Sequence, residues 1–337
     1  MTSITKYTVI IAVFIFLFTA CAKCPFICHN ESAGGLTSIL KENAVMEKVT
    51  PGITFDTAGS PLWTESGFFF TNNNFDPADK SKTYFMDNSG NSKIIRENNG
   101  VTTSLKLTGK GTFYCCEMIG HRVVEMNAGG KALRVVAGEY NGKRLDGPND
   151  LVVDKKGGFY FTDSKFSPGQ ELVQDKPAVY YVNPAGKISR VIDDVEFPNG
   201  IGLSPDGKIL YIANTRGPLT KGRFLLAYDI LPDCSVKNGR NFAELQLTDE
   251  DNNKPDGFGG ADGLAVDSAG NVYAATTKGL GIQVFNKNGA HLGNISCPAI
   301  TNNMCFGGED LKTLYISAKD SIYKIDLKNS GIKWQIK

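Results

Sequence analysis

The amino-acid sequence predicts an all-β fold, a six-bladed β-propeller, on three observations. From about residue 45 onward, apolar and polar residues alternate with the period of a β-strand, and almost no long stretch has the period of a helix. The chain holds 37 glycines among its 337 residues. This exceeds the average of about 7% and favours many tight turns. A strand-turn-strand unit also recurs along the chain.

The repeated unit is clearest in three segments, residues 148–163, 198–214 and 261–275. Each segment opens with an amide or carboxylate residue two positions before an apolar alternation. It continues through a turn that contains glycine and reaches a second strand near a tyrosine. Such a unit is a β-hairpin. The opening residues are Asn149, Asn199 and Asp262.

Weaker copies of the unit occur at residues 60–70, 99–116 and 303–317, which brings the number of copies to about six. Neighbouring copies start about 40 to about 60 residues apart, which is enough for a four-stranded blade with loops of variable length. Solenoids, the main competing architecture, have more uniform and usually shorter periods. We therefore expect six blades arranged radially.

The N-terminal segment predicts export. A short apolar run, Val9–Phe18, follows Lys6 and leads into small residues around Cys21. The run is too short to span a bilayer, which takes about 20 residues, and its layout is that of a secretory signal. We expect residues 1–21 to be a signal peptide of the lipoprotein type. A lipid on Cys21 would then be the only membrane contact of a cell-envelope lipoprotein. Cleavage after Ala22, which gives a secreted soluble protein, is the alternative.

The remaining chain divides into a tether, residues 22–44, and one propeller domain, residues 45–337. Cys24 and Cys28 fall in the tether. Because no second pair of metal ligands lies nearby, a disulfide or free thiols are favoured there over zinc. The eight cysteines of the chain leave seven besides Cys21, so at least one lacks an intramolecular partner.

Charge composition narrows the choice of partner. Lys and Arg number 36 against 35 Asp and Glu, a formal net charge of +1. Nucleic-acid binding normally requires a broad basic field, so we expect no nucleic-acid partner. We expect instead a small-molecule substrate and a monomeric protein.

Equivalent positions of a radial repeat lie at the same height around its axis, so Asn149, Asn199 and Asp262 should converge on one mouth of the channel. Taken singly, each is explained by turn chemistry, because Asn and Asp are common turn residues. Three oxygen-bearing side chains at one register suit a hard cation, Ca²⁺ above all, with other divalent cations as alternatives. The three histidines of the chain occupy unrelated registers, which disfavours zinc.

Four blocks of sequence together resemble a known family. They are Gly-Lys-Arg-Leu-Asp-Gly-Pro-Asn-Asp (142–150), Phe-Pro-Asn-Gly-Ile-Gly-Leu-Ser-Pro-Asp-Gly (197–207), Gly-Gly-Ala-Asp-Gly-Leu-Ala-Val-Asp (259–267) and Phe-Gly-Gly-Glu-Asp-Leu-Lys-Thr-Leu-Tyr (306–315). The family is that of gluconolactonase, regucalcin (senescence marker protein) and diisopropyl fluorophosphatase. The resemblance extends over residues 55–326.

This resemblance implies a six-bladed propeller with a divalent cation, usually calcium, at the axial mouth. It also implies hydrolysis of lactones or phosphoesters. By motif, Asn149 and Asn199 are implied to be metal ligands. Asp262 is implied to be a ligand and also the catalytic base or nucleophile. We therefore expect an exported, calcium-dependent hydrolase that opens a lactone ring, with a sugar lactone as the first choice of substrate.

One position departs from the family pattern. The family has a Glu-Gly-Pro-x-Trp motif, whereas residues 59–63 read Gly-Ser-Pro-Leu-Trp, so Gly59 stands where a carboxylate ligand is expected. With Asp262 as the only formally charged ligand, calcium should bind more weakly. This departure keeps open an alternative function, that of a non-catalytic propeller that binds a ligand at a degenerate metal site.

The wall of the site is expected to include Glu117, His121 and Arg122, because the family has a similar Glu and Arg after the matching strand. We assign these three residues to substrate binding, with a salt bridge between blade loops as the alternative. Asp163 and Asn214 end strands in matching repeats. They either support the ligands or cap turns.

Overall fold

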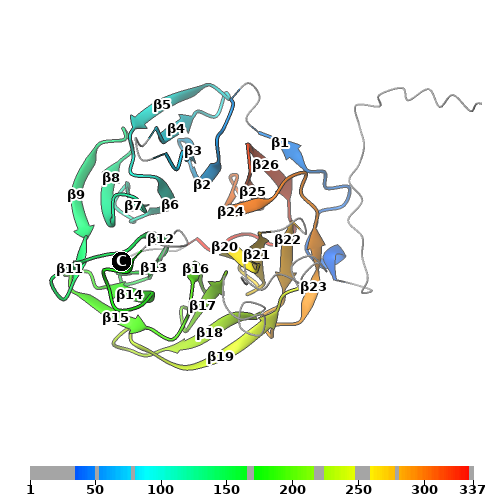
Figure 1. The fold of residues 1–337 in the computed structure, drawn as a ribbon. Coiled ribbons are helices and arrows are strands. Elements are labelled where there is room, and N and C mark those ends of the chain that lie inside the picture. Colours follow the sequence, from blue (N-terminus) through cyan, green and yellow to red (C-terminus); the bar gives the residue numbers. More distant parts are fainter. Residues whose placement is uncertain are drawn as a thin grey trace, which may run out of the picture.

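Six four-stranded antiparallel sheets surround a central axis (Figure 1). The computed structural model describes residues 35–49, 53–76, 80–164, 171–215, 224–246, 259–277 and 281–333. Apart from one 3₁₀ turn, the elements of this part of the chain are strands. The prediction of an all-β, six-bladed propeller is confirmed.

In blades 1 to 5 the first strand in the sequence lies nearest the axis, and the next strands follow outward (Figure 1). Blades 1 to 3 comprise β2 (Ala58–Thr64), β3 (Gly67–Asn72), β4 (Lys82–Met86) and β5 (Ser92–Glu97); β6 (Thr102–Leu107), β7 (Thr112–Glu117), β8 (Arg122–Asn127) and β9 (Ala132–Ala137); and β12 (Pro148–Val153), β13 (Phe159–Asp163), β14 (Ala178–Val182) and β15 (Ile188–Ile192). Blades 4 and 5 comprise β16 (Pro198–Leu203), β17 (Ile209–Asn214), β18 (Phe224–Ile230) and β19 (Val236–Glu244); and β20 (Ala261–Val266), β21 (Val272–Thr276), β22 (Ile282–Phe285) and β23 (His291–Ile295). A small hairpin of β10 (Glu139–Tyr140) and β11 (Lys143–Arg144) connects blades 2 and 3.

Both ends of the described chain build the last blade. Blade 6 contains β24 (Thr301–Gly307), β25 (Thr313–Ala318) and β26 (Ser321–Asp326), and its outer strand is β1 (Glu47–Lys48) from the N-terminal side. Glu47 is paired in register with Lys324, and their side chains also form an ion pair of 3.1 Å. Because exposed ion pairs contribute little, strand pairing and the apolar core must hold this closure.

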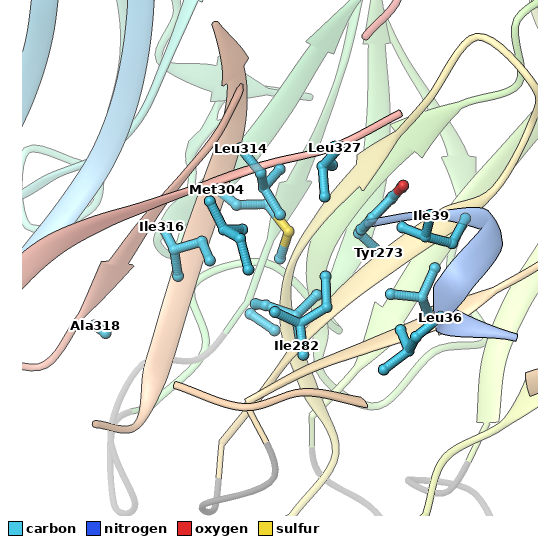
Figure 2. Close-up of a cluster of buried hydrophobic side chains, with 13 residues drawn as sticks. Leu36, Ile39, Tyr273, Ile282, Met304, Leu314, Ile316, Ala318 and Leu327 are labelled. Atoms are coloured by element: carbon cyan, nitrogen blue, oxygen red, sulfur yellow. The ribbon is translucent and has the colours of Figure 1, made fainter. Parts of the chain in front are cut away.

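The described residues just before β1, 35–44, are not a tether, contrary to the expectation; residues 22–34 of the expected tether lie outside the described residues. The 3₁₀ turn η1 (Leu36–Ser38) places Leu36 and Ile39, 2% and 1% exposed, in a core cluster between blades 5 and 6 (Figure 2). Gly293 of β23 makes room for this turn, since a Cβ there would lie 2.6 Å from Leu36 Cγ. Burial of two large apolar side chains fixes the segment, so the folded domain begins by residue 36 rather than at 45.

Every innermost strand contains a register irregularity near its start, and this feature shapes the axial mouth. The shifts fall between Gly59 and Leu62, Thr102 and Ser104, Pro148 and Leu151, Pro198 and Ile201, Ala261 and Leu264, and Thr301 and Asn303. Such a β-bulge leaves an extra residue outside the ladder and re-aims its side chain. Each shift is given above by the two residues that flank it, and we call the residue directly after the first of the two the bulge position. In order, the bulge positions are Ser60, Thr103, Asn149, Asn199, Asp262 and Asn302.

The described residues include five of the eight cysteines but not the N-terminal segment that was expected to contact the membrane. Cys115, Cys116, Cys234, Cys297 and Cys305 are free thiols. The expected signal peptide, the lipid on Cys21 and the Cys24 and Cys28 pair lie outside the described residues. Among the residues that are described, no helix has the length and apolar character needed to cross a bilayer.

The packing of the N-terminal turn can be tested by substitution. Ile39→Ala should lower the free energy of unfolding by about 2–5 kcal/mol, because it leaves a cavity in a closed cluster. Val45→Ala is the matched control, since Val45 is 54% exposed and should change stability by no more than about 0.5 kcal/mol. Urea unfolding of both variants measures the difference. Equal, small effects would mean that the turn is not part of the folded core.

Candidate metal and active site

Asn149, Asn199 and Asp262 occupy bulge positions of three consecutive blades, 3, 4 and 5. The side chain of Asn199 hydrogen-bonds to the carboxylate of Asp262, so blades 4 and 5 meet at this level. The backbone oxygens of both asparagines bind hydroxyls of other strands. Thr103 Oγ1 donates to the oxygen of Asn149 at 2.6 Å, and Thr162 Oγ1 donates to that of Asn199 at 2.7 Å. The main chain at both bulges is therefore anchored by groups other than the asparagine side chains.

Asp150, which follows the bulge position of blade 3, brings a second carboxylate to the site. It is 1% exposed, and its charge acts on Asp262. Its Oδ1 accepts hydrogen bonds from Ser104 Oγ at 2.6 Å and from the amide of Leu151 at 2.8 Å. Sequence reasoning did not select Asp150. The available signal was that no other copy of the unit has a charged residue after its bulge position.

The electrostatics of the site disfavour the simultaneous ionisation of two carboxyl groups, those of Asp150 and Asp262. Asp262 is only half-buried as a residue, but desolvation of its carboxyl group raises its pKa to about 7, and the charge of Asp150 adds to this rise. The hydrogen bond from Asn199 opposes the rise without cancelling it. A carboxyl group with this pKa is poised to exchange protons near neutral pH.

Two oxygens at the site are buried and lack a hydrogen-bond donor among the described residues, Asn199 Oδ1 and Asp150 Oδ2. Leaving such a group unpaired costs about 1–3 kcal/mol, and more for a charged group. A cation among these oxygens would satisfy both and would offset the repulsion between Asp150 and Asp262. In the described ranges, no three His, Cys, Asp or Glu side chains gather closely enough to hold a metal. A cation here must therefore use amide oxygens. Ca²⁺ accepts such ligands, whereas zinc prefers nitrogen and sulfur.

The residues expected to bind substrate lie at the top of blade 2. Glu117 is fully buried and pairs through Oε1 with Arg96 and through Oε2 with Arg122, the latter at 2.7 Å. His121 Nδ1 lies 2.7 Å from the backbone oxygen of Asp146. Desolvation lowers the pKa of His121, which favours its neutral form at pH 7. Both oxygens of Glu117 are thus occupied, and Arg122, whose side chain is 44% exposed, is better placed to contact a ligand.

Asp163 and Asn214 have the same structural role in neighbouring blades. Asp163 accepts hydrogen bonds from the amides of Asp146 and Gly147 at 3.0 and 2.6 Å. Asn214 Oδ1 accepts the amide of Phe197 at 3.0 Å. Each side chain therefore fixes the segment that leads into an innermost strand just before its bulge.

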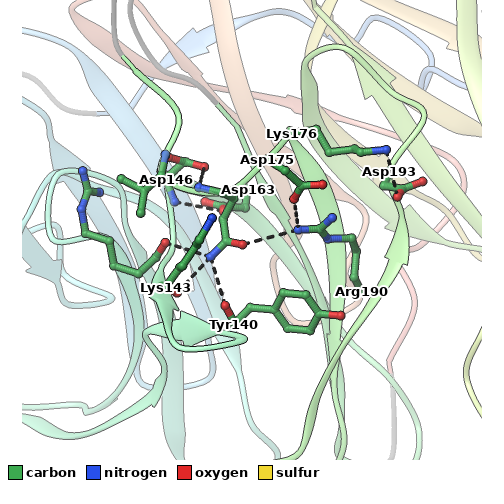
Figure 3. Close-up of polar contacts among 11 residues, drawn as sticks. Tyr140, Lys143, Asp146, Asp163, Asp175, Lys176, Arg190 and Asp193 are labelled. Carbon is green, nitrogen blue, oxygen red and sulfur yellow. Dashed lines mark hydrogen bonds and ion pairs between the residues drawn. The ribbon is translucent and has the colours of Figure 1, made fainter.

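A polar cluster extends this support above blade 3 (Figure 3). The carboxylate of Asp146 accepts the amides of Val173 and Gln174 at 2.6 and 3.1 Å, and Gln174 Nε2 in turn donates to the backbone oxygens of the β10–β11 hairpin. Arg190 stacks on Tyr140 and pairs with Asp175 at 2.6 Å. The cluster ties the segment before Asn149 to blade 3.

Residues 57–320 match the family described as SMP-30/Gluconolactonase/LRE-like region. A gluconolactonase of Zymomonas mobilis is 27% identical over 319 residues, which cover 88% of this chain and 85% of that protein.

Two solved structures share the fold. A gluconolactonase of Xanthomonas campestris superposes with a TM-score of 0.74 at 23% identity, covering 89% of this chain and 95% of that one. The calcium-binding protein regucalcin of Agrobacterium tumefaciens superposes with a TM-score of 0.66 at 16% identity, covering 85% and 96%.

Asp163 predicts a pH dependence of stability. Burial raises the pKa of its carboxyl group to about 7 in the folded protein, above the value of about 3.9 for an unfolded chain. The folded state therefore binds the proton more tightly. The stability that Asp163 contributes is fully present below about pH 4 and is lost as the pH rises through about 7. Asp163→Asn removes this titration, and Asn214 shows that an amide fits the equivalent position.

Urea unfolding between pH 4 and 8 measures this effect. Between pH 4 and 7, the free energy of unfolding of Asp163→Asn should rise relative to that of the unmodified protein by up to about 1.4 kcal/mol for each pH unit. Asp229→Asn is the control, because hydrogen bonds from Asn238 and Arg240 lower the pKa of this exposed carboxyl group. If the unmodified protein and Asp163→Asn have the same pH profile, Asp163 is ionised in the folded state throughout.

Proposed function

The chain belongs to the SMP-30/gluconolactonase/LRE-like family, and from this premise we propose that it is a calcium-dependent hydrolase that opens lactone rings, most simply those of sugar lactones. The observation that carries the proposal is the group of Asn149, Asn199 and Asp262 at equivalent bulge positions, beside buried oxygens without donors. The named activities of the Zymomonas and Xanthomonas relatives support the reaction class. The calcium-binding regucalcin supports the choice of cation over other divalent metals.

Each ligand has a defined part in this proposal. Asn149 and Asn199 supply neutral oxygens, and Asp262 supplies a charged one. Asp150 lies next to them and adds a second negative charge. A bound calcium ion would polarise the lactone carbonyl as a Lewis acid.

Asp262 would act as the base in ring opening. Its carboxylate takes a proton from water while the water oxygen bonds to the carbonyl carbon. The ring ester C–O bond then breaks, the proton passes to the ring oxygen, and the product is a hydroxy acid. Without a cation the pKa of Asp262 is raised to about 7; a bound calcium ion would lower this pKa and keep the carboxylate ionised at neutral pH. Arg122 would contact the polar groups of the substrate from blade 2.

One observation favours a second candidate function. Gly59 lies at the axial end of blade 1 and supplies no side chain, so one carboxylate that the family pattern expects is missing. A propeller that binds a sugar, lactone or peptide without turnover would tolerate this loss. The two functions differ in whether calcium binding is accompanied by hydrolysis.

The proposal is tested by titrating the full chain with Ca²⁺ in a calorimeter and following aldonolactone hydrolysis in a pH-stat. We expect measurable binding and turnover that EDTA removes. Asp262→Asn should lower kcat by about 10²- to 10⁴-fold, which is the usual contribution of a positioned base. Asp229→Asn, on the outer part of blade 4, is the control and should retain full activity. Turnover that survives EDTA, or the absence of turnover on every lactone and phosphoester, would favour the binding function.

We also propose, from the sequence pattern of residues 1–22 alone, that the protein is exported and carries a lipid on Cys21. Full-length protein expressed in bacteria should partition into the detergent phase of a Triton X-114 extract. Cys21→Ser should move it to the aqueous phase. Recovery of both proteins in the aqueous phase would support cleavage after Ala22 instead.

A further inference from the structure

A third buried oxygen without a donor lies in blade 1. Asn73 follows β3 directly and is 4% exposed, and its Oδ1 has no hydrogen-bond partner in the described part of the chain. Its backbone amide donates to the oxygen of Thr57 at 2.8 Å, which fixes the main chain at this point. Unpaired buried oxygens are rare in folded proteins, so this one needs an explanation.

The carboxamide of Asn73 fills the space that a side chain at position 59 would need. A Cβ built on Gly59 would lie 2.8 Å from Asn73 Nδ2 and 3.0 Å from Thr71 Oγ1. Gly59 directly precedes Ser60, the bulge position of blade 1. Nδ2 of Asn302, the bulge position of blade 6, donates to the backbone oxygen of the neighbouring Ala58 at 2.9 Å. The Asn73 carboxamide therefore packs against blade 1 at the level of the bulge positions.

Other oxygens of blade 1 are already used or point elsewhere. Ser60 Oγ donates to the backbone oxygen of Thr102 at 3.2 Å. Asp56 is exposed and accepts a hydrogen bond from Asn74. Glu65 is exposed at the opposite end of β2 and pairs with Lys333. Of these candidates, Asn73 alone offers a buried oxygen that no donor satisfies.

We infer that Asn73 supplies the oxygen that blade 1 contributes to the axial cation, in place of a side chain at position 59. This inference rests on the proposed function. The Oδ1 of Asn73 has no hydrogen-bond partner within the described residues, so it can turn toward a cation without breaking a hydrogen bond. The blade 1 ligand is then neutral, and the negative charge of the site comes from Asp150 and Asp262 alone.

The inference predicts a specific loss of affinity. Asn73→Ala in the full chain should weaken Ca²⁺ binding, measured by calorimetry, roughly tenfold or more, since even indirect supports of a metal site cost at least this much. Asn74→Ala is the matched control. Asn74 is the next residue, bonds to Asp56 and the amide of Asp76, and should leave the affinity unchanged.

Stability and a second background separate ligation from a structural role. In EDTA, Asn73→Ala should unfold at nearly the same temperature as the unmodified protein, because removal of the unpaired Oδ1 offsets the packing lost against Gly59. Gly59→Glu must displace the Asn73 carboxamide. In that background Asn73→Ala should therefore no longer change the Ca²⁺ affinity.

The outcomes distinguish this inference from the proposed function. If the unmodified chain binds Ca²⁺, Asp262→Asn abolishes binding and Asn73→Ala leaves it intact, Asn73 is not a ligand and the proposed function stands. If Asn73→Ala destabilises the protein in EDTA and retains affinity, its role is structural and the inference is wrong. If the unmodified chain binds no Ca²⁺, the proposed calcium dependence fails, and the role of Asn73 fails with it.

Discussion

The β-bulge at the start of each innermost strand is the constraint on which the rest of the site depends. A regular strand would alternate its side chains between the two faces of the blade, and none would be aimed specifically at the mouth. The extra residue breaks this alternation once in every blade, close to the start of the innermost strand. Six positions that are far apart in sequence therefore lie around one axis, and the residue at each of them carries a side-chain oxygen.

Polar contacts between blades hold this geometry in place. Hydroxyls of Thr103 and Thr162 bind backbone oxygens at the bulges, and Ser104 binds Asp150 across the boundary between blades 2 and 3. The side-chain oxygens of Asn73 and Asn199 and one carboxylate oxygen of Asp150 have no such partner among the described residues. Three of the buried oxygens without donors, on Asn73, Asp150 and Asn199, lie in blades 1, 3 and 4. The blades thus satisfy the backbone while leaving side-chain oxygens to a ligand, which is the pattern expected of a preorganised cation site.

Much of the fold could be predicted from the sequence, because the repeated unit predicts which strands pair and which positions are equivalent in each blade. The three strong copies also gave Asn149, Asn199 and Asp262. The weak copies were less informative, since a bulge depends on pairing with the next strand rather than on a residue type. The second copy was expected to start at about residue 99, whereas the bulge position of that blade is Thr103.

The other differences have similar physical causes. Burial of Leu36 and Ile39 follows from contact with β23, which no local pattern of residues 22–44 reveals. The roles of Asp150 and Asn73 likewise appear only in three dimensions. One acts through the charge it presents to Asp262, and the other lies over a glycine 14 residues earlier in the chain. Gly59 was correctly seen as a missing side chain, but the residue that fills its space could not be read from spacing.

A crystal structure of the full chain grown with Ca²⁺ tests whether the bulge positions form one cation site. We expect a single strong peak of density on the propeller axis, with oxygens of Asn149, Asn199 and Asp262 at about 2.3–2.6 Å from it. An ion bound away from these three side chains, or a mouth in which their oxygens do not share an ion, would contradict the assignment.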